Sequence, residues 1–252
     1  MLYNMKWSQI RKHLLLLLLL SNAVFAFSQD VTLDYNAYKI SKENRVDSSY
    51  IKMLKPYKDS LSKQMDKVIG FAVNTMYKKQ PESALGNLLA DCVKTMAEKR
   101  YKKTVDIGMV NFGGVRSYIT KGDITVGKVF ELMPFDDMLI IQQLRGDTLQ
   151  LLLNRIAEKG GWPISGLTMQ IKGNQALNIM IGGKALDTLA YYTVANSDYI
   201  ANGGDDCNML KPILQTNGGY IIRDAIVDYL KMITEQGNPI DAKTEKRITY
   251  AN

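Results

Sequence analysis

Apolar residues recur at three- and four-residue intervals in several stretches of the chain, which is the pattern of amphipathic helices. The strongest stretch follows Pro81 and carries an apolar stripe over residues 85–96, with Ser83 placed to cap the helix. Similar spacing predicts helices over residues 51–68, with Pro56 as a kink or a late start, and over residues 125–132, 147–159 and 220–233. Thr125 and Asp147 are the expected N-caps of the helices that begin there.

Short apolar or alternating runs predict strands between these helices. They lie at residues 68–76, 105–110, 138–144, 167–172, 178–181, 191–195 and 247–250. Helical and strand patterns alternate without a visible internal repeat or a low-complexity linker. This organisation favours a single mixed α/β (α+β) domain with layered packing.

The first 29 residues have the pattern of a secretory signal peptide. Basic residues precede a run of leucines at 14–20, and Val24-Phe25-Ala26 offers a small-residue exit. The apolar stretch is shorter than the roughly 20 residues of a spanning helix, and no later run is long enough to span. We therefore expect an exported bacterial protein, periplasmic, secreted or in the cell envelope, with its domain over residues 30–252 and no membrane span.

Charge and histidine content narrow the possible chemistry. Removing the three basic residues of the leader lowers the formal net charge from +7 to +4, a modest excess that suits an anionic small ligand and does not indicate nucleic-acid binding. The single histidine, His13, lies in the leader, so the mature chain has no Ser-His-Asp, Cys-His or histidine-rich metal site. Cys92 and Cys207 form either a disulfide or two buried thiols, and the sequence leaves both open.

Three polar segments contain residues that contribute little to packing. Residues 111–116 follow an apolar strand and combine two glycines with an amide and a guanidinium, groups suited to a phosphate ester. Pro134-Phe135 holds an aromatic ring just before the next strand, and residues 198–206 place Tyr199 ahead of a Gly-Gly-Asp loop. Taken singly, the two glycine-containing segments also fit surface turns, and Phe135 also fits a core position.

Together, in this order and at this spacing, the three segments resemble the nucleotide-binding C-terminal domain of the 5′-nucleotidase / UDP-sugar hydrolase family. The resemblance extends over residues 46–250 and implies a layered α/β/β/α fold. The other segments that carry it are residues 82–88, 124–130, 144–149, 164–167 and 247–248.

The resemblance also implies a ligand and a set of contacts. Phe135 and Tyr199 would stack on the two faces of a nucleobase. Asn111 would bind the base edge, Asp205 would accept from ribose hydroxyls, and Arg116 would face the phosphate of the nucleotide. The remaining expected substrate-binding residues are Gly113, Gly114 and Gly204. No catalytic residue, metal ligand or cofactor is expected in this chain.

The chain departs from the family pattern beside this site. Phe112 stands where a further glycine is usual, and it either narrows the pocket or turns outward. Asp136-Asp137 replaces a glycine–asparagine pair and adds negative charge near the expected base. Asp206 replaces another glycine, and Lys78-Lys79 stands near the place of an arginine that helps to hold phosphate. These differences bear on base identity and affinity more than on fold.

Two-domain members of the family also carry a metallophosphatase domain, whose two divalent metals activate the attacking water. No such domain is recognisable in this sequence, so we expect the chain alone to be inactive toward phosphate esters. Our first hypothesis is a substrate-specificity subunit that a separately encoded metallophosphatase completes. The alternatives are a periplasmic nucleotide- or nucleoside-binding protein without a catalytic partner, and a degenerate interaction module.

Overall fold

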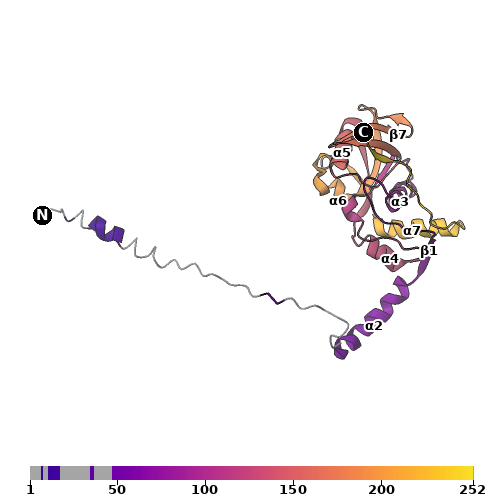
Figure 1. The fold of residues 1–252 in the computed structure, drawn as a ribbon, viewed down its shortest axis with the longest axis horizontal. Helices are drawn as coiled ribbons and strands as arrows, with labels where there is room; N and C mark the ends of the chain where they lie inside the picture. Colours follow the sequence, from indigo (N-terminus) through magenta and orange to yellow (C-terminus); the bar gives the residue numbers. More distant parts are fainter. Residues whose placement is uncertain (1–6, 8–10, 18–34, 37–46, 252) are drawn as a thin grey trace. The chain divides into compact units, whose positions relative to one another are not determined.

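A computed structural model describes residues 7, 11–17, 35–36 and 47–251 of the chain (Figure 1). The chain divides into two units, residues 1–49 and 50–252, and the folded domain lies in the second. Most of the predicted leader and its junction with the domain lie outside the described residues. Within the described ranges, no helix combines the length and the apolar character that a membrane crossing requires.

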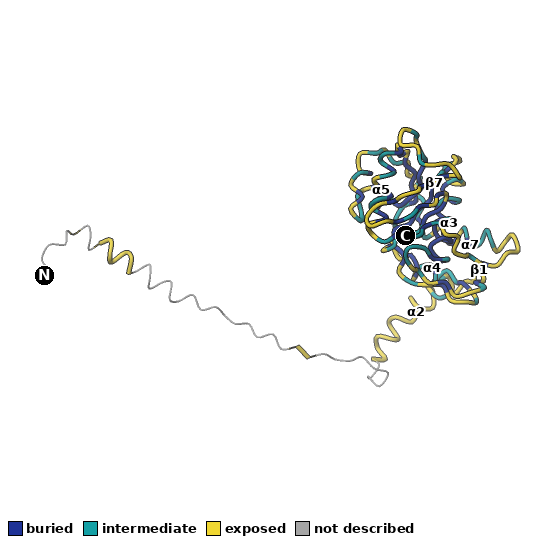
Figure 2. The backbone as a smooth tube through the Cα atoms, turned by 45° about the horizontal axis from the view of Figure 1, so that its top comes forward, coloured by how far each residue is buried: buried dark blue, intermediate teal, exposed yellow. Residues whose placement is uncertain are grey.

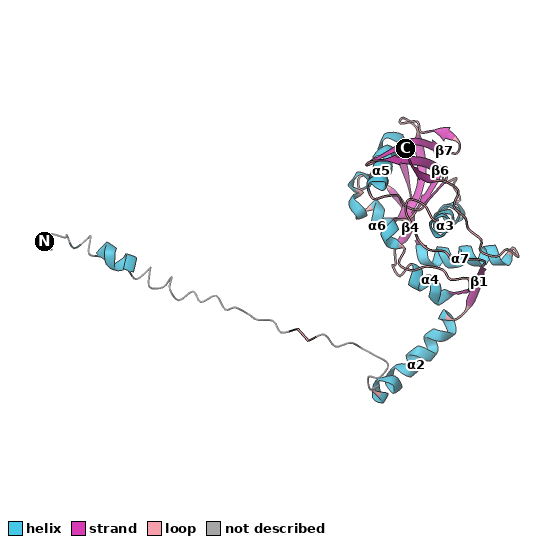
Figure 3. Ribbon diagram, in the orientation of Figure 1, coloured by secondary structure: helices cyan, strands magenta, loops and turns pink. Residues whose placement is uncertain are grey.

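A five-stranded sheet with the order β10-β4-β9-β2-β5 forms the centre of the domain (Figure 3). β2 and β9 run parallel, β4 runs antiparallel to both β9 and β10, and β5 runs antiparallel to β2. Its strands are β2 (Ile107–Met109), β4 (Met138–Arg145), β5 (Ile164–Ser165), β9 (Tyr191–Ser197) and β10 (Gln215–Ile221). Side chains on both faces of this sheet are buried, so the sheet separates two hydrophobic cores.

Two smaller sheets complete the β structure. A four-stranded sheet has the order β11-β6-β7-β8, and a two-stranded sheet pairs β1 with β3. Their strands are β1 (Val68–Ala72), β3 (Gly122–Thr125), β6 (Leu167–Lys172), β7 (Gln175–Ile181), β8 (Lys184–Ala185) and β11 (Ile248–Tyr250). The mixed, layered α/β fold expected from the sequence is thus confirmed.

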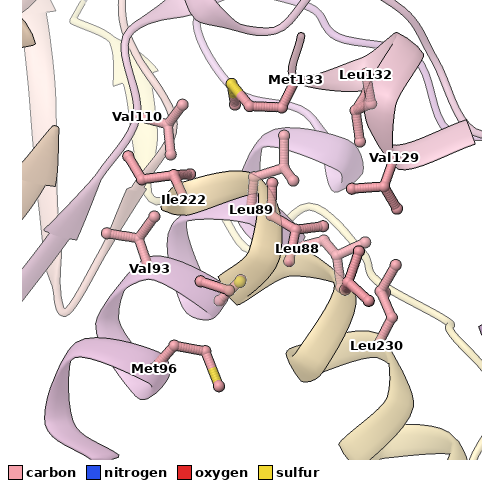
Figure 4. Close-up of a cluster of buried hydrophobic side chains, with 14 of the residues drawn as sticks. Leu88, Leu89, Val93, Met96, Val110, Val129, Leu132, Met133, Ile222 and Leu230 are labelled. Atoms are coloured by element: carbon pink, nitrogen blue, oxygen red, sulfur yellow. The ribbon is translucent and has the colours of Figure 1, made fainter. Parts of the chain in front are cut away.

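The first core lies between one face of the central sheet and the helices α3 (Ala84–Tyr101), α4 (Val126–Leu132) and α7 (Ile222–Glu235). Figure 4 shows side chains of all three helices meeting in this core. The predicted caps are confirmed, because the Ser83 hydroxyl accepts from the Gly86 amide at 3.0 Å and the Thr125 hydroxyl accepts from the Lys128 amide at 3.2 Å. Gly108 of β2 allows α3 to approach closely, since a Cβ there would lie 2.7 Å from the Ala90 carbonyl oxygen.

The second core lies on the opposite face, between the central sheet, the four-stranded sheet and α5 (Gly146–Glu158). The apolar stripe of α5, which includes Leu149, Leu152 and Ile156, is fully buried there. Cys92 belongs to the first core and Cys207 to the second, and both are buried free thiols. The disulfide that the sequence left open is therefore not formed.

The predicted N-cap at Asp147 is wrong. The helix begins one residue earlier, at Gly146, and the Asp147 carboxylate pairs with Arg145 instead. The Gly146 and Asp147 amides donate to the carbonyl oxygens of Ala190 and Thr188, at 2.8 and 3.0 Å. Backbone groups of a neighbouring loop therefore satisfy the helix start in place of a side chain.

Two further segments differ from expectation. The helix predicted over residues 220–233 begins at Ile222, and Tyr220 belongs to β10, an edge strand that the sequence pattern did not predict. The first predicted helix forms as α2 (Ser48–Met65) with Pro56 inside it, but none of its residues is buried (Figure 2). Its apolar stripe therefore does not contribute to either core.

Candidate functional site

The three polar segments meet at one edge of the central sheet. Because β2 and β9 are parallel, their carboxyl ends lie at the same edge. β4 runs antiparallel to β9, with Leu139 opposite Ser197, so the amino end of β4 lies there too. The loops that follow β2, precede β4 and follow β9 enclose a pocket of about 290 Å³. The topology thus brings together segments that are far apart in the sequence.

All of the expected site residues except Gly204 line this pocket, and one further residue, Asp137, joins them. The lining residues are Asn111, Gly113, Gly114, Arg116, Phe135, Asp137, Tyr199 and Asp205. Their proximity is a feature of the structure, whereas their binding roles stay a prediction.

Asn111 and Asp205 connect the first and third loops. Asn111 is only 8% exposed, and its Nδ2 donates to Asp205 Oδ2 at 2.8 Å. Gly114 permits this arrangement, because a Cβ at that position would lie 2.6 Å from Asn111 Oδ1. Asp205 has a left-handed backbone conformation with φ of 51°, which turns its side chain within the short helix η2 (Gly204–Asp206). The carboxylate is therefore held in place by both loops.

The two aromatic rings lie on the pocket wall and not in the core. Phe135 is 40% exposed and Tyr199, in the short helix α6 (Asp198–Ala201), is 46% exposed. The Tyr199 hydroxyl lies 3.4 Å from Asp205 Oδ1. Gly204 packs directly under the Tyr199 ring, since a Cβ on Gly204 would lie 2.4 Å from Tyr199 Cε1. Gly204 therefore supports a lining residue instead of lining the pocket itself.

Two cations stand at the first loop. The Arg116 guanidinium lies 5.8 Å from the centre of the Phe135 ring, and its Nη1 donates to the Gly113 carbonyl oxygen at 3.2 Å. Lys78 donates to the Val115 carbonyl oxygen at 2.7 Å from behind this loop. Burial, and then the nearby positive charge of Arg116, lower the pKa of Lys78. Arg116 is thus the cation that faces the pocket, and Lys78 braces the loop that carries it.

Phe112 does not narrow the pocket. Its ring turns away and packs against the second core, with Lys78 Nζ 4.4 Å from the ring centre. Of the two alternatives that the sequence left open for Phe112, narrowing of the pocket is not observed, and the ring is partly buried against the core and not directed outward to solvent.

Asp137 is the lining residue that was not among the expected site residues. Burial raises the pKa of its carboxyl group, and the negative charges of Asp198 and Asp136 raise it further. Its signal in the sequence was the replacement of a glycine–asparagine pair directly after Pro134-Phe135.

Over the part of the chain that the structure describes, no three His, Cys, Asp or Glu side chains group so as to hold a metal ion.

Comparison with known proteins agrees with this architecture. A family model described as 5′-nucleotidase, C-terminal domain, matches residues 63–212. The 5′-nucleotidase of Vibrio parahaemolyticus serotype O3:K6 is 33% identical over 168 residues, which cover 64% of this chain and 28% of that protein. The trifunctional nucleotide phosphoesterase protein YfkN of Bacillus subtilis is 31% identical over 184 residues, which cover 66% of this chain and 12% of that protein.

Among solved structures, the 5′-nucleotidase precursor from Thermus thermophilus is similar with a TM-score of 0.70 and 29% identity, over 82% of this chain and 44% of that one. The chain therefore spans less than half the length of these relatives. The family model covers more than half of this chain, and it does so across all three loops of the pocket. This chain belongs to the 5′-nucleotidase C-terminal domain family.

Proposed function

We propose that this protein binds a nucleotide or nucleoside in the pocket at the edge of the central sheet, as the substrate-specificity part of a 5′-nucleotidase-type hydrolase in nucleotide catabolism. The observation that carries the proposal is that Phe135 and Tyr199 line the same pocket. Two partly exposed rings from distant segments line one pocket, which a flat heterocycle can enter and stack against.

The polar groups around the rings suit the rest of a nucleotide. Asp205 is an acceptor-only group that Asn111 and Tyr199 hold in place, and its remaining lone pairs are suited to ribose hydroxyls. Arg116, whose guanidinium lies 5.8 Å from the centre of the Phe135 ring, supplies a planar cation for phosphate. A pocket of about 290 Å³ is at the small end of ligand sites, so base and ribose fill it and the phosphate points outward.

The hydrolytic step belongs, in this proposal, to a separately encoded metallophosphatase. The leader pattern of residues 1–29 supports a location in the periplasm or outside the cell.

Calorimetry of the purified protein with AMP, GMP, UMP and adenosine tests the binding proposal. Phe135→Ala and Tyr199→Ala should each weaken nucleotide binding by roughly 1–3 kcal/mol, the usual contribution of base–aromatic stacking. Tyr191→Ala is a matched control, because Tyr191 is 66% exposed and lies at the opposite end of β9. Equal losses in all three variants would remove the rings from the site.

Two other outcomes point to the alternatives. No heat with any ligand, at protein concentrations sufficient for weak binding, leaves only an interaction module. Binding without any change in AMP hydrolysis, when the protein is added to a metallophosphatase encoded beside its gene, leaves a binding protein without a catalytic role.

A further inference from the structure

Asp137 is the one carboxylate of the pocket wall whose oxygens are free. Asp205, the other lining carboxylate, already accepts from Asn111 through one oxygen and lies near the Tyr199 hydroxyl with the other. Among the described residues, no side chain or backbone group donates to the Asp137 carboxylate, although its backbone carbonyl accepts from the Ile222 amide at 2.9 Å. A partly buried acceptor in a ligand pocket is thus left for the ligand.

The neighbouring acidic residues are engaged elsewhere. Asp136 pairs with Arg223 at 2.6 Å and points to solvent. Asp198 Oδ1 accepts from the amides of Met138 and Tyr199, at 2.8 and 2.9 Å. Neither of these carboxylates lines the pocket, so Asp137 alone presents this chemistry beside Phe135.

An ionised carboxylate only accepts hydrogen bonds, and its two oxygens match two neighbouring donors. Guanine presents such a pair, the ring N1–H beside the exocyclic amino group. Adenine and cytosine present an amino group beside a ring nitrogen that accepts, and uracil presents its N3–H between two carbonyl oxygens. In these three bases a lone pair would face the carboxylate, so guanine is the base whose edge fits it best.

We propose that Asp137 makes this pocket selective for guanine, by accepting from the two adjacent donors of the base edge while Phe135 and Tyr199 hold its faces. This inference rests on the proposed function, because it assigns a base to the same pocket. The amide usual at this position in the family would instead donate and accept, a pairing that suits adenine.

Ligands that differ by single groups test the selectivity directly. By calorimetry, the purified protein should bind GMP about tenfold more tightly than AMP, as a bidentate pair discriminates between bases. IMP keeps the N1–H and lacks the amino group, so it should bind about tenfold more weakly than GMP. Equal affinities for GMP and IMP, or tighter binding of AMP than of GMP, would overturn the inference.

Asp137→Asn changes the donor pattern and keeps the shape of the side chain. It should lower GMP affinity by about tenfold and shift the preference toward AMP. Asp136→Asn is the matched control. It removes an equal negative charge at the neighbouring position, and the Asp136 side chain does not line the pocket. The ratio of GMP to AMP affinity should stay within about twofold of wild type in this control.

The outcomes separate the inference from the proposed function. If no nucleotide binds, both are wrong. If nucleotides bind but Asp137→Asn leaves the GMP-to-AMP ratio unchanged, or Asp136→Asn shifts that ratio as much, the pocket binds nucleotides without base selection by Asp137.

Discussion

Gly204 offers a way to disturb the pocket without changing any group that touches the ligand. A Cβ added there would lie 2.4 Å from Cε1, 2.5 Å from Cζ and 2.6 Å from Cδ1 of Tyr199. Carbon atoms in contact are normally about 3.5–4.0 Å apart, so in Gly204→Ala the ring has to move by about 1 Å or more. Gly204 does not have a positive φ, so alanine can adopt its backbone conformation and the strain falls on the ring.

The structure also sets the magnitude of the two effects. Tyr199 is nearly half exposed, so its ring can swing toward solvent, and the cost to stability should be about 1 kcal/mol, the low end of overpacking. That corresponds to a fall in Tm of about 2–4 °C. Loss of one stacking face should cost nucleotide binding roughly 1–3 kcal/mol, which weakens the affinity about thirtyfold at the middle of that range.

Calorimetry of four proteins tests this reasoning: wild type, Gly204→Ala, Tyr199→Ala and the double variant. Because Gly204 acts only through Tyr199, the double variant should bind no more weakly than Tyr199→Ala alone. Wild-type affinity in Gly204→Ala would show that the Tyr199 ring does not need this position. Additive losses in the double variant would show that Gly204 acts on the ligand by another route.

Two further predictions concern stability and thiol chemistry. Asp137→Asn should raise Tm at pH 7, because the pKa of Asp137 is higher in the folded protein than its ordinary value of 3.8. Its ionised form therefore opposes folding: the cost is absent below that ordinary value and appears as the pH rises through the folded-state pKa. Thermal melts at pH 7 and pH 3 check this, and a difference that persists at pH 3 contradicts it. Cys92 and Cys207 should react with a thiol reagent much more slowly in the native protein than in the unfolded chain. Each is buried in a separate core, and burial raises both pKa values, that of Cys207 to about 11. A Cys92–Cys207 disulfide found by mass spectrometry of unreduced protein would show that the two cores rearrange.

The elements that the sequence predicted well are those with local signals. α3 and α4 combine a helical stripe with a capping hydroxyl at Ser83 and Thr125, and both caps form as expected. β10 carries Asn217, Gly218 and Gly219, residues that disfavour strands, and it joins the sheet because its backbone pairs with β4 on both sides of a register shift between Asn217 and Ile221. The start of α5 likewise depends on a distant loop, which no local pattern at Asp147 could reveal.

The site was predicted through the resemblance more than through any single motif. Each loop alone also fitted an ordinary turn, and only the pairing of β2, β4 and β9 brings Asn111, Phe135 and Tyr199 to one pocket. In the sequence, Asp137 stood out only as a departure from the family pattern. That its carboxylate is unpaired while those of Asp136 and Asp198 have partners follows from the tertiary structure alone. Hydrogen bonds between segments this far apart do not follow from spacing along the chain.

The pocket lies on three loops at the edge of a sheet whose strands pair independently of those loops. Residues that determine recognition are therefore different from residues that determine the fold. Phe135 and Asp137 line the pocket from outside the strand pairs of β4, β9 and β2, so in the proposed function substitutions there change recognition and leave that strand ladder untouched. Ligand preference can therefore drift among descendants of one ancestor while the scaffold stays constant. Within this family, a shared architecture is accordingly a poor guide to which base a given descendant prefers.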